Sequence, residues 1–174
     1  MDLDKATELI KPAFTDIGVK TYWADLGCGS GLFTSALAQL LHEGSFIYGV
    51  DSSKHSLERL QPFTSVGLKK IVADFTRDDL AISELDGILM ANSLHFVKDK
   101  ISFIQKTQQW LKKDGLILLV EYDMDKSNTW VPYPLSFDSS KRLFSQLGFA
   151  INKIGEHASV YNRAGMYAAV IRRY

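Results

Sequence analysis

Apolar runs and amphipathic stretches alternate along almost the whole chain. Short apolar runs bounded by turn residues are typical of buried strands, and apolar positions three and four residues apart are typical of helices. Runs of the first kind predict strands at residues 21–26, 46–50, 68–73, 87–91 and 116–122. Stretches of the second kind predict helices at residues 32–42, 53–62, 99–111 and 137–147. Such alternation implies parallel strands joined by right-handed crossovers.

The two ends of the chain depart from this alternation. An N-terminal segment, residues 1–18, contains a predicted lead-in helix over about residues 3–17, with Pro12 as a kink or boundary. Two further strands are expected at 150–155 and 166–172, close enough in sequence to form an antiparallel hairpin. Residues 125–134 are rich in Asn, Trp, Tyr and Pro and predict a loop. The segment 123–137 that contains it would either line the substrate side or form a plug over the edge of the sheet.

Composition fits one globular domain that spans residues 1–174. The chain is 46% hydrophobic and 23% charged, with a formal net charge of zero, which disfavours nucleic acid and anionic membranes as partners. The one cysteine, Cys28, cannot form an internal disulfide, and no apolar run reaches the roughly 18 residues that span a bilayer. The N-terminus has no signal-peptide pattern. We therefore expect a cytoplasmic monomer or homodimer that acts on a small molecule.

Three glycines and two carboxylates mark a ligand-binding corner. Gly27, Gly29 and Gly31 stand between the first predicted strand and the next helix, where glycine permits positive φ and close approach of a ligand to the backbone. Asp25 precedes these glycines. Asp51 ends the second strand, where an acid can accept hydrogen bonds from both hydroxyls of a ribose.

The glycine spacing discriminates between nucleotide ligands. A dinucleotide fingerprint requires a glycine three residues after Gly29, but Leu32 stands there. A phosphate-binding P-loop requires a lysine after its last glycine, and no lysine lies between Lys20 and Lys54. The remaining pattern, Asp-x-Gly-x-Gly-x-Gly, favours a different adenosine-bearing ligand.

At this point the chain resembles the class I S-adenosylmethionine-dependent methyltransferases, in particular their small type 11/12 methyltransferase domains. The resemblance rests on motifs in the same order and at similar spacing: DLGCGSG at 25–31, GVD at 49–51, ADF at 73–75, DGILMANSLHF at 86–96 and KKDGLILLV at 112–120. It implies a Rossmann-like α/β fold with a seven-stranded, mostly parallel sheet in the order 3-2-1-4-5-7-6, the last strand antiparallel, and helices on both faces.

The resemblance also implies a cofactor, S-adenosylmethionine, whose product is S-adenosylhomocysteine. Asp25 is expected near the methionyl amino group, and Asp74 with Phe75 near the adenine, although an acid after a strand can equally be a helix cap. Cys28 is expected to pack within the turn rather than react. The residues expected to bind the cofactor are Asp25, Gly27, Cys28, Gly29, Gly31, Asp51, Ser52, Asp74, Phe75 and Asn92.

Catalytic candidates lie after the fourth and fifth strands. His95 is either a general base, because its ordinary pKa is near neutrality, or a residue that packs or caps; Tyr122 is the second candidate. No metal site is expected.

The loop that begins at Asn92 lacks the Asn/Asp-Pro-Pro-Tyr/Phe run of similar enzymes that methylate nucleic acids and proteins, which favours a metabolite as acceptor. Two alternatives are a non-catalytic cofactor-binding subunit and an NAD-dependent oxidoreductase, the latter disfavoured by the glycine spacing.

Overall fold

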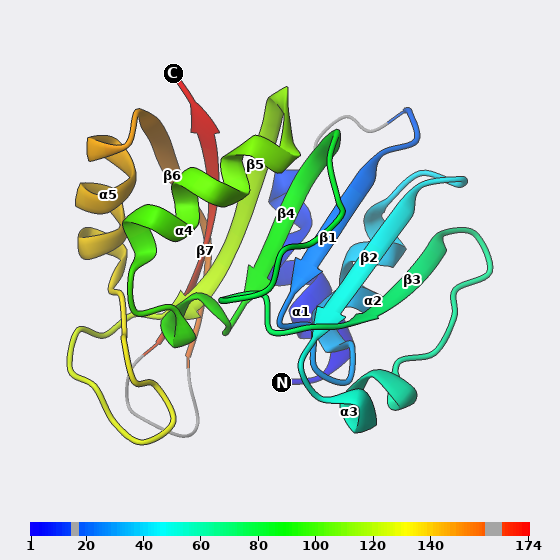
Figure 1. Cartoon of the computed structure of the whole chain (residues 1–174), viewed down its shortest axis with the longest axis horizontal. Helices are drawn as coiled ribbons and strands as arrows, with labels where there is room; N and C mark the ends of the chain where they lie inside the picture. The colour runs from blue at the N-terminus through cyan, green and yellow to red at the C-terminus, as the bar shows by residue number, and fades with distance from the viewer. Residues whose placement is uncertain (15–17, 159–164) are drawn as a thin grey trace.

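The protein is built on one seven-stranded sheet (Figure 1). The computed structural model describes residues 1–14, 18–158 and 165–174. The strands are β1 (Tyr22–Leu26), β2 (Phe46–Asp51), β3 (Gly67–Val72), β4 (Leu85–Ala91), β5 (Leu111–Tyr122), β6 (Phe149–His157) and β7 (Met166–Arg173). The α-helices are α1 (Leu3–Ile10), α2 (Leu32–Leu40), α3 (Lys54–Arg59), α4 (Lys100–Thr107) and α5 (Phe137–Gln146).

The strand order is β3-β2-β1-β4-β5-β7-β6, which confirms the predicted order. The pairs from β3 through β5 are parallel, whereas β7 runs antiparallel to both β5 and β6. The predicted Rossmann-like methyltransferase fold is therefore confirmed, including its terminal hairpin.

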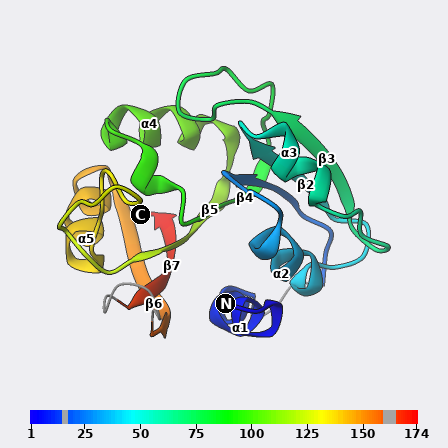
Figure 2. The ribbon, with the colours of Figure 1, turned by 90° about the horizontal axis from the view of Figure 1, so that it is seen from below.

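The strands send alternate side chains into two hydrophobic layers. Ile88 and Ile117 pack with residues of α4 and α5, whereas their neighbours Leu89 and Leu118 pack with residues of α1 and α2. Figure 2 shows α1 and α2 on one side of the sheet and α4 on the other. Because successive strand residues point to opposite faces, an apolar run without alternation is what a sheet covered on both faces requires.

The lead-in helix is shorter than the sequence predicts. The α-helix ends at Ile10, a 3-10 turn follows at Lys11–Ala13, and Phe14 is no longer helical, so the predicted helix is wrong at that residue; its last part, 15–17, lies outside the described residues. Pro12 explains the end of the helix, because it has no N–H to donate to the carbonyl four residues earlier.

The fifth strand begins earlier than predicted, and the fourth helix ends earlier. Leu111 pairs with Leu85 before a register shift, and regular pairing of β5 with β4 resumes at Leu116. The helix predicted over 99–111 ends at Thr107 and continues as a 3-10 turn, Gln108–Trp110. The pairing beside Leu85 is a tertiary contact that a local apolar pattern does not reveal.

One edge of the sheet collects the loops that matter for function. The carboxyl ends of β1, β2, β4 and β5 point to the lower side of Figure 1, where α3 and the loop between β5 and α5 also lie. Ligands of open α/β sheets bind at this edge. In the described part of the chain, no helix is long and apolar enough to cross a membrane.

Candidate functional site

The glycine turn joins β1 to α2 through alternate residues in the left-handed region. Gly27, Gly29 and Gly31 have φ values of 78°, 55° and 91°, which glycine adopts without strain. The backbone N–H of Gly27 donates to the carbonyl of Val50 at 2.8 Å, so the turn is fixed to the end of β2. A Cβ on Gly29 would meet no atom within 4 Å, so open space lies beside the backbone there.

Asp51 holds the same turn from the side of β2. Its Oδ2 accepts from the backbone N–H of Gly29 at 2.8 Å, and its Oδ1 accepts from the N–H of Ser53 at 2.8 Å. A carboxylate has about four lone-pair sites, so two N–H donors leave capacity for two more donors. Asp51 therefore both shapes the turn and can receive ligand hydroxyls.

Asp25 is a buried carboxylate with one oxygen free of partners among the described residues. The residue is 1% exposed; Oδ2 accepts from Thr34 Oγ1 at 2.6 Å, and no described residue is a partner of Oδ1. Burial raises the pKa of Asp25 to about 7; the hydrogen bond from Thr34 opposes this rise and nearby Asp51 adds to it. A cation beside Oδ1 would favour the charged form.

The loop after β4 supplies two more buried polar atoms without partners among the described residues, Asn92 Oδ1 and Ser93 Oγ. Asn92 has a positive φ of 54°, and its N–H donates to Val120 at 2.8 Å, which fixes the turn. Buried polar groups are nearly always hydrogen-bonded in native proteins. Together with Asp25 they indicate that a polar ligand completes this region.

Two cavities flank Gly27. The larger, with a volume of about 410 Å³, is lined by Gly27, Asp51, Ser52, Asp74, Phe75, Ser93 and three further residues. The smaller, about 260 Å³, is lined by Asp25, Gly27, Cys28, Gly29, Asn92 and four further residues. We call them the first and the second cavity. A ligand that occupies both would cross the backbone at Gly27, where a side chain would also collide with Ser93.

Asp74 and Phe75 lie together in the first cavity, as expected. Asp74 Oδ1 accepts from the backbone N–H and the hydroxyl of Thr76 at 3.0 and 2.6 Å, so this acid does form a local turn. Its Oδ2 lies 3.5 Å from Arg77 Nε. Because the described residues between β3 and β4 contain no helix, Asp74 is not a helix cap; one of its oxygens fixes a turn and the other faces Arg77.

Two of the predicted cofactor residues have packing roles in the turn. Cys28 packs with Leu57 and Leu60, and burial raises the pKa of its thiol, which keeps it protonated and unreactive. A Cβ on Gly31 would lie 2.2 Å from a methyl carbon of Leu60, so that position requires glycine for packing.

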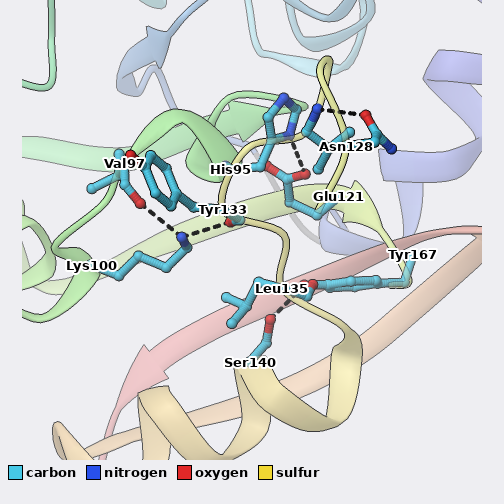
Figure 3. Close-up of polar contacts among 10 residues, drawn as sticks. His95, Val97, Lys100, Glu121, Asn128, Tyr133, Leu135, Ser140 and Tyr167 are labelled. Atoms are coloured by element: carbon cyan, nitrogen blue, oxygen red, sulfur yellow. Dashed lines mark hydrogen bonds and ion pairs between the residues drawn. The ribbon is translucent and has the colours of Figure 1, made fainter. Parts of the chain in front are cut away.

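His95 and Glu121 form a buried pair beneath the loop between β5 and α5 (Figure 3). His95 is 3% exposed, its Nδ1 lies 2.8 Å from Glu121 Oε2, and its backbone N–H donates to Oε1 at 3.1 Å. Because an ionised carboxylate only accepts, Nδ1 is the nitrogen that donates to Glu121, and in the neutral ring Nε2 is then the acceptor. The ring of Tyr122 lies 6.1 Å from that of His95, and Phe96, not His95, lines the first cavity.

Some residues of the site have only a weak signal in the sequence. Thr34 is one of several small polar residues in a predicted helix, and Ser93 follows Asn92 in a polar loop. Glu121 ends an apolar strand, which indicates a place at the carboxyl edge but not a partner. Only the fold brings Glu121 to His95, 26 residues away.

Comparisons with known proteins decide the family. Residues 24–119, more than half of the chain, match the family model described as a methyltransferase domain. The chain belongs to this family. It is 30% identical over 103 residues to the carboxy-S-adenosyl-L-methionine synthase of Pasteurella multocida and to the ubiquinone biosynthesis O-methyltransferase of Haemophilus ducreyi. These matches cover 56% and 55% of this chain but only 43% and 42% of the relatives.

A solved structure extends the likeness to the whole fold. An S-adenosylmethionine-dependent methyltransferase from Leishmania major superposes with a TM-score of 0.78 over 98% of this chain and 72% of its own, at 20% identity. The predictions of a class I methyltransferase and of S-adenosylmethionine as its cofactor are confirmed. The residues present fit that cofactor, because Asp25 Oδ1, which has no partner in the described part of the chain, suits an ammonium group, and the open space at Gly29 suits close approach.

Proposed function

We propose that this protein transfers a methyl group from S-adenosylmethionine to a small-molecule acceptor. The observation that supports this most directly is the row of buried polar atoms, on Asp25, Asn92 and Ser93, that lack partners within the described residues and lie along two cavities joined at Gly27. When bound, the cofactor supplies an electrophilic methyl group on a positively charged sulfur. Holding two reactants in register contributes about 7–11 kcal/mol to such reactions.

In this proposal the chain's own residues mainly bind and orient. Asp51 and Ser52 receive ribose hydroxyls, Asp74 and Phe75 contact the adenine, and Asp25 receives the amino group. Asp51 and Asp74 are preorganised for this, because backbone N–H groups already fix their carboxylates. A site held in place before the ligand arrives loses less entropy on binding.

His95 is the proposed general base, with Tyr122 as a neighbouring candidate. The contact between the Glu121 carboxylate and Nδ1 supports this role, because in the neutral ring it leaves Nε2 as the proton acceptor. A base is required only when the acceptor must lose a proton before or during transfer, as a hydroxyl must. The deep burial of His95 favours the packing alternative.

A non-catalytic cofactor-binding subunit is the second candidate, because a shared fold does not by itself establish catalysis. Turnover distinguishes the two. Purified protein is incubated with S-adenosylmethionine carrying a deuterated methyl group and a panel of hydroxyl, thiol and amine metabolites, and products are examined by mass spectrometry. Acceptor-dependent S-adenosylhomocysteine together with a labelled product supports the enzyme, whereas tight cofactor binding without turnover of any acceptor supports the subunit. A cytoplasmic location and a monomeric or homodimeric state remain part of this proposal.

A further inference from the structure

The first cavity, which would hold adenine and ribose, is bounded from both sides of the glycine turn. Asp51 and Ser52 follow β2, whereas Ser93 and Phe96 follow β4, and all four line this cavity. Since β1 lies between β2 and β4 in the sheet, the two pairs approach the cavity from opposite sides. A ligand held by acids on the β2 side therefore meets the loop after β4 across the cavity.

Phe75 and Phe96 offer different surfaces to that ligand. Phe75 is 7% exposed, and its ring lies edge-on against that of Phe103, with 5.8 Å between the centroids and 65° between the planes. Phe96 is 52% exposed, and its ring lies beside that of His95, with 4.3 Å between the centroids. Of the two phenylalanines, Phe96 therefore has the larger uncovered apolar surface, on which a flat base can stack.

The end of the first cavity at Phe96 adjoins a second space. Thr76, Arg77 and Phe96 line both the first cavity and a neighbouring cavity of about 470 Å³ beside α4. Of these three shared residues, Phe96 is the aromatic one. A base bound at this end would face open space on one side unless the ring of Phe96 covers it.

The turn that carries Phe96 also carries a buried polar group that requires a partner. Ser93 is 1% exposed and lines the first cavity, and its hydroxyl has no partner among the described residues. The N–H of Phe96 donates to the carbonyl of Ser93 at 3.2 Å, so one short turn holds both residues. Because buried polar groups are nearly always hydrogen-bonded, Ser93 indicates, independently of Phe96, that a ligand lies against this turn.

The loop between β5 and α5 fixes this turn. The N–H of Tyr133 donates to the carbonyl of His95 at 3.0 Å. The ammonium group of Lys100 donates to the carbonyls of Val97 and Tyr133, both at 2.8 Å, and it lies between them in Figure 3. The residues on both sides of Phe96 are therefore held before a ligand arrives, which reduces the entropy lost on binding.

We propose that Phe96 binds the adenine of the cofactor by stacking, while Asp51 and Asp74 contact the edges of the ligand and the Ser93 hydroxyl is a hydrogen-bond partner from the same turn. This inference rests on the proposed function, because it adds a residue to the cofactor side of the same site. Phe75, in contrast, mainly supports the cavity from below through its contact with Phe103.

Calorimetric titration with S-adenosylhomocysteine compares the wild type with three variants. No acceptor is present, so the affinity reports on the cofactor side alone. Phe96→Ala should weaken binding by about tenfold or more, whereas Phe96→Trp should stay within about threefold of the wild type, because an indole also stacks on a base. Ile101→Ala is the matched control: Ile101 is 48% exposed and lies in α4, but it lines neither of the two cavities, so the affinity should not change.

Phe96→Trp also supplies a spectroscopic readout that a packing role would not produce. Stacking of adenine on the introduced indole should quench its fluorescence in step with the calorimetric binding curve. The wild type is the reference for this signal. It has three tryptophans, Trp23, Trp110 and Trp130, and none of them lines the first cavity.

The inference is overturned if Phe96→Ala binds with wild-type affinity, if Phe96→Trp binds as weakly as Phe96→Ala, or if the fluorescence of Phe96→Trp does not change as the ligand binds. In each of these results the wild type still binds, so the proposed function stands. Absence of binding by the folded wild type would overturn both claims. The predicted effects at Phe96 without turnover of any acceptor would overturn only the proposed methyl transfer.

Discussion

At the scale of single residues, the site depends on carboxylates that the fold has placed in different environments. Asp51 accepts two backbone N–H groups, whereas Asp25 is buried with one hydrogen bond and a pKa raised to about 7. The sequence places both acids correctly at strand ends, but the difference between them comes from burial, which a local pattern does not contain. That difference makes the two acids separable by experiment.

Asp51→Asn should weaken cofactor binding by about tenfold or more, because the amide keeps one acceptor oxygen and loses the charge that two ribose hydroxyls would contact. Calorimetric titration with S-adenosylhomocysteine measures the affinity of the variant and of the wild type. Asp86→Asn is the matched control. Asp86 also accepts a backbone N–H at 2.8 Å, from Tyr22, but it lies at the amino end of β4, away from the carboxyl edge of the sheet where Asp51 lies. Equal affinities in wild type and Asp51→Asn would remove the ribose assignment.

Asp25 predicts a pH dependence of cofactor affinity. Below the raised pKa of about 7 the free protein holds a proton on Asp25, and a bound ammonium group would expel it. Affinity should therefore rise as pH increases toward 7 and level off above it, with proton release visible as a buffer-dependent binding enthalpy. Asp25→Asn should abolish that dependence. Thr34→Val, which deletes the hydrogen bond that lowers the pKa, should move the rise to higher pH.

The two possible roles of His95 predict different results for variants of His95 and of its partner Glu121. If His95 is the base, His95→Ala lowers turnover by about 10²–10⁴ while cofactor affinity is unchanged. Glu121→Gln should lower it similarly, because the amide N–H donates to Nδ1 and moves the ring proton to Nε2. A packing role predicts loss of melting temperature with full activity per folded molecule. Turnover, affinity and melting temperature of both variants decide between the roles.

At the scale of elements, the glycine turn is the unit that the sequence predicts best. Its three alternate glycines, the acid before it and the helix after it are contiguous in the chain, so local geometry determines the whole motif. Elements that depend on distant partners are predicted less well. The start of β5 is set by pairing of Leu111 with Leu85. The loops after β4 and β5 are joined by Lys100, whose ammonium group donates to the carbonyl of Tyr133, 33 residues away.

Gly29→Val should abolish cofactor binding, because the added side chain occupies the open space beside the turn. It should also cost about 1–3 kcal/mol of stability, since the residue has a positive φ. Gly44→Val is the matched control: Gly44 also has a positive φ and open surroundings, but lies in the turn between α2 and β2. Calorimetric affinities and melting temperatures compare the two. Similar destabilisation with binding retained in both would mean that the turn is only structural.

At the scale of the whole molecule, the sequence predicts the fold and the cofactor more fully than the acceptor. Strand order follows from the resemblance and from the alternation of apolar runs, which the two packed faces of the sheet require. The loops at the carboxyl edge of the sheet follow β4 and β5, and their arrangement depends on contacts such as those of Tyr133 with His95 and Lys100. No single stretch of sequence contains that information.

The central claim is that the corner around Gly27 holds S-adenosylmethionine. The most direct test is native mass spectrometry of the purified protein with S-adenosylmethionine, S-adenosylhomocysteine or NAD, supported by calorimetric titration of each. We predict one bound molecule per chain for the first two and none for NAD. The glycine spacing suits an adenosyl amino acid, and so does Asp25 Oδ1, which no described residue contacts with a hydrogen bond. Binding of NAD in preference, or no binding of S-adenosylmethionine by the folded protein, would contradict the account.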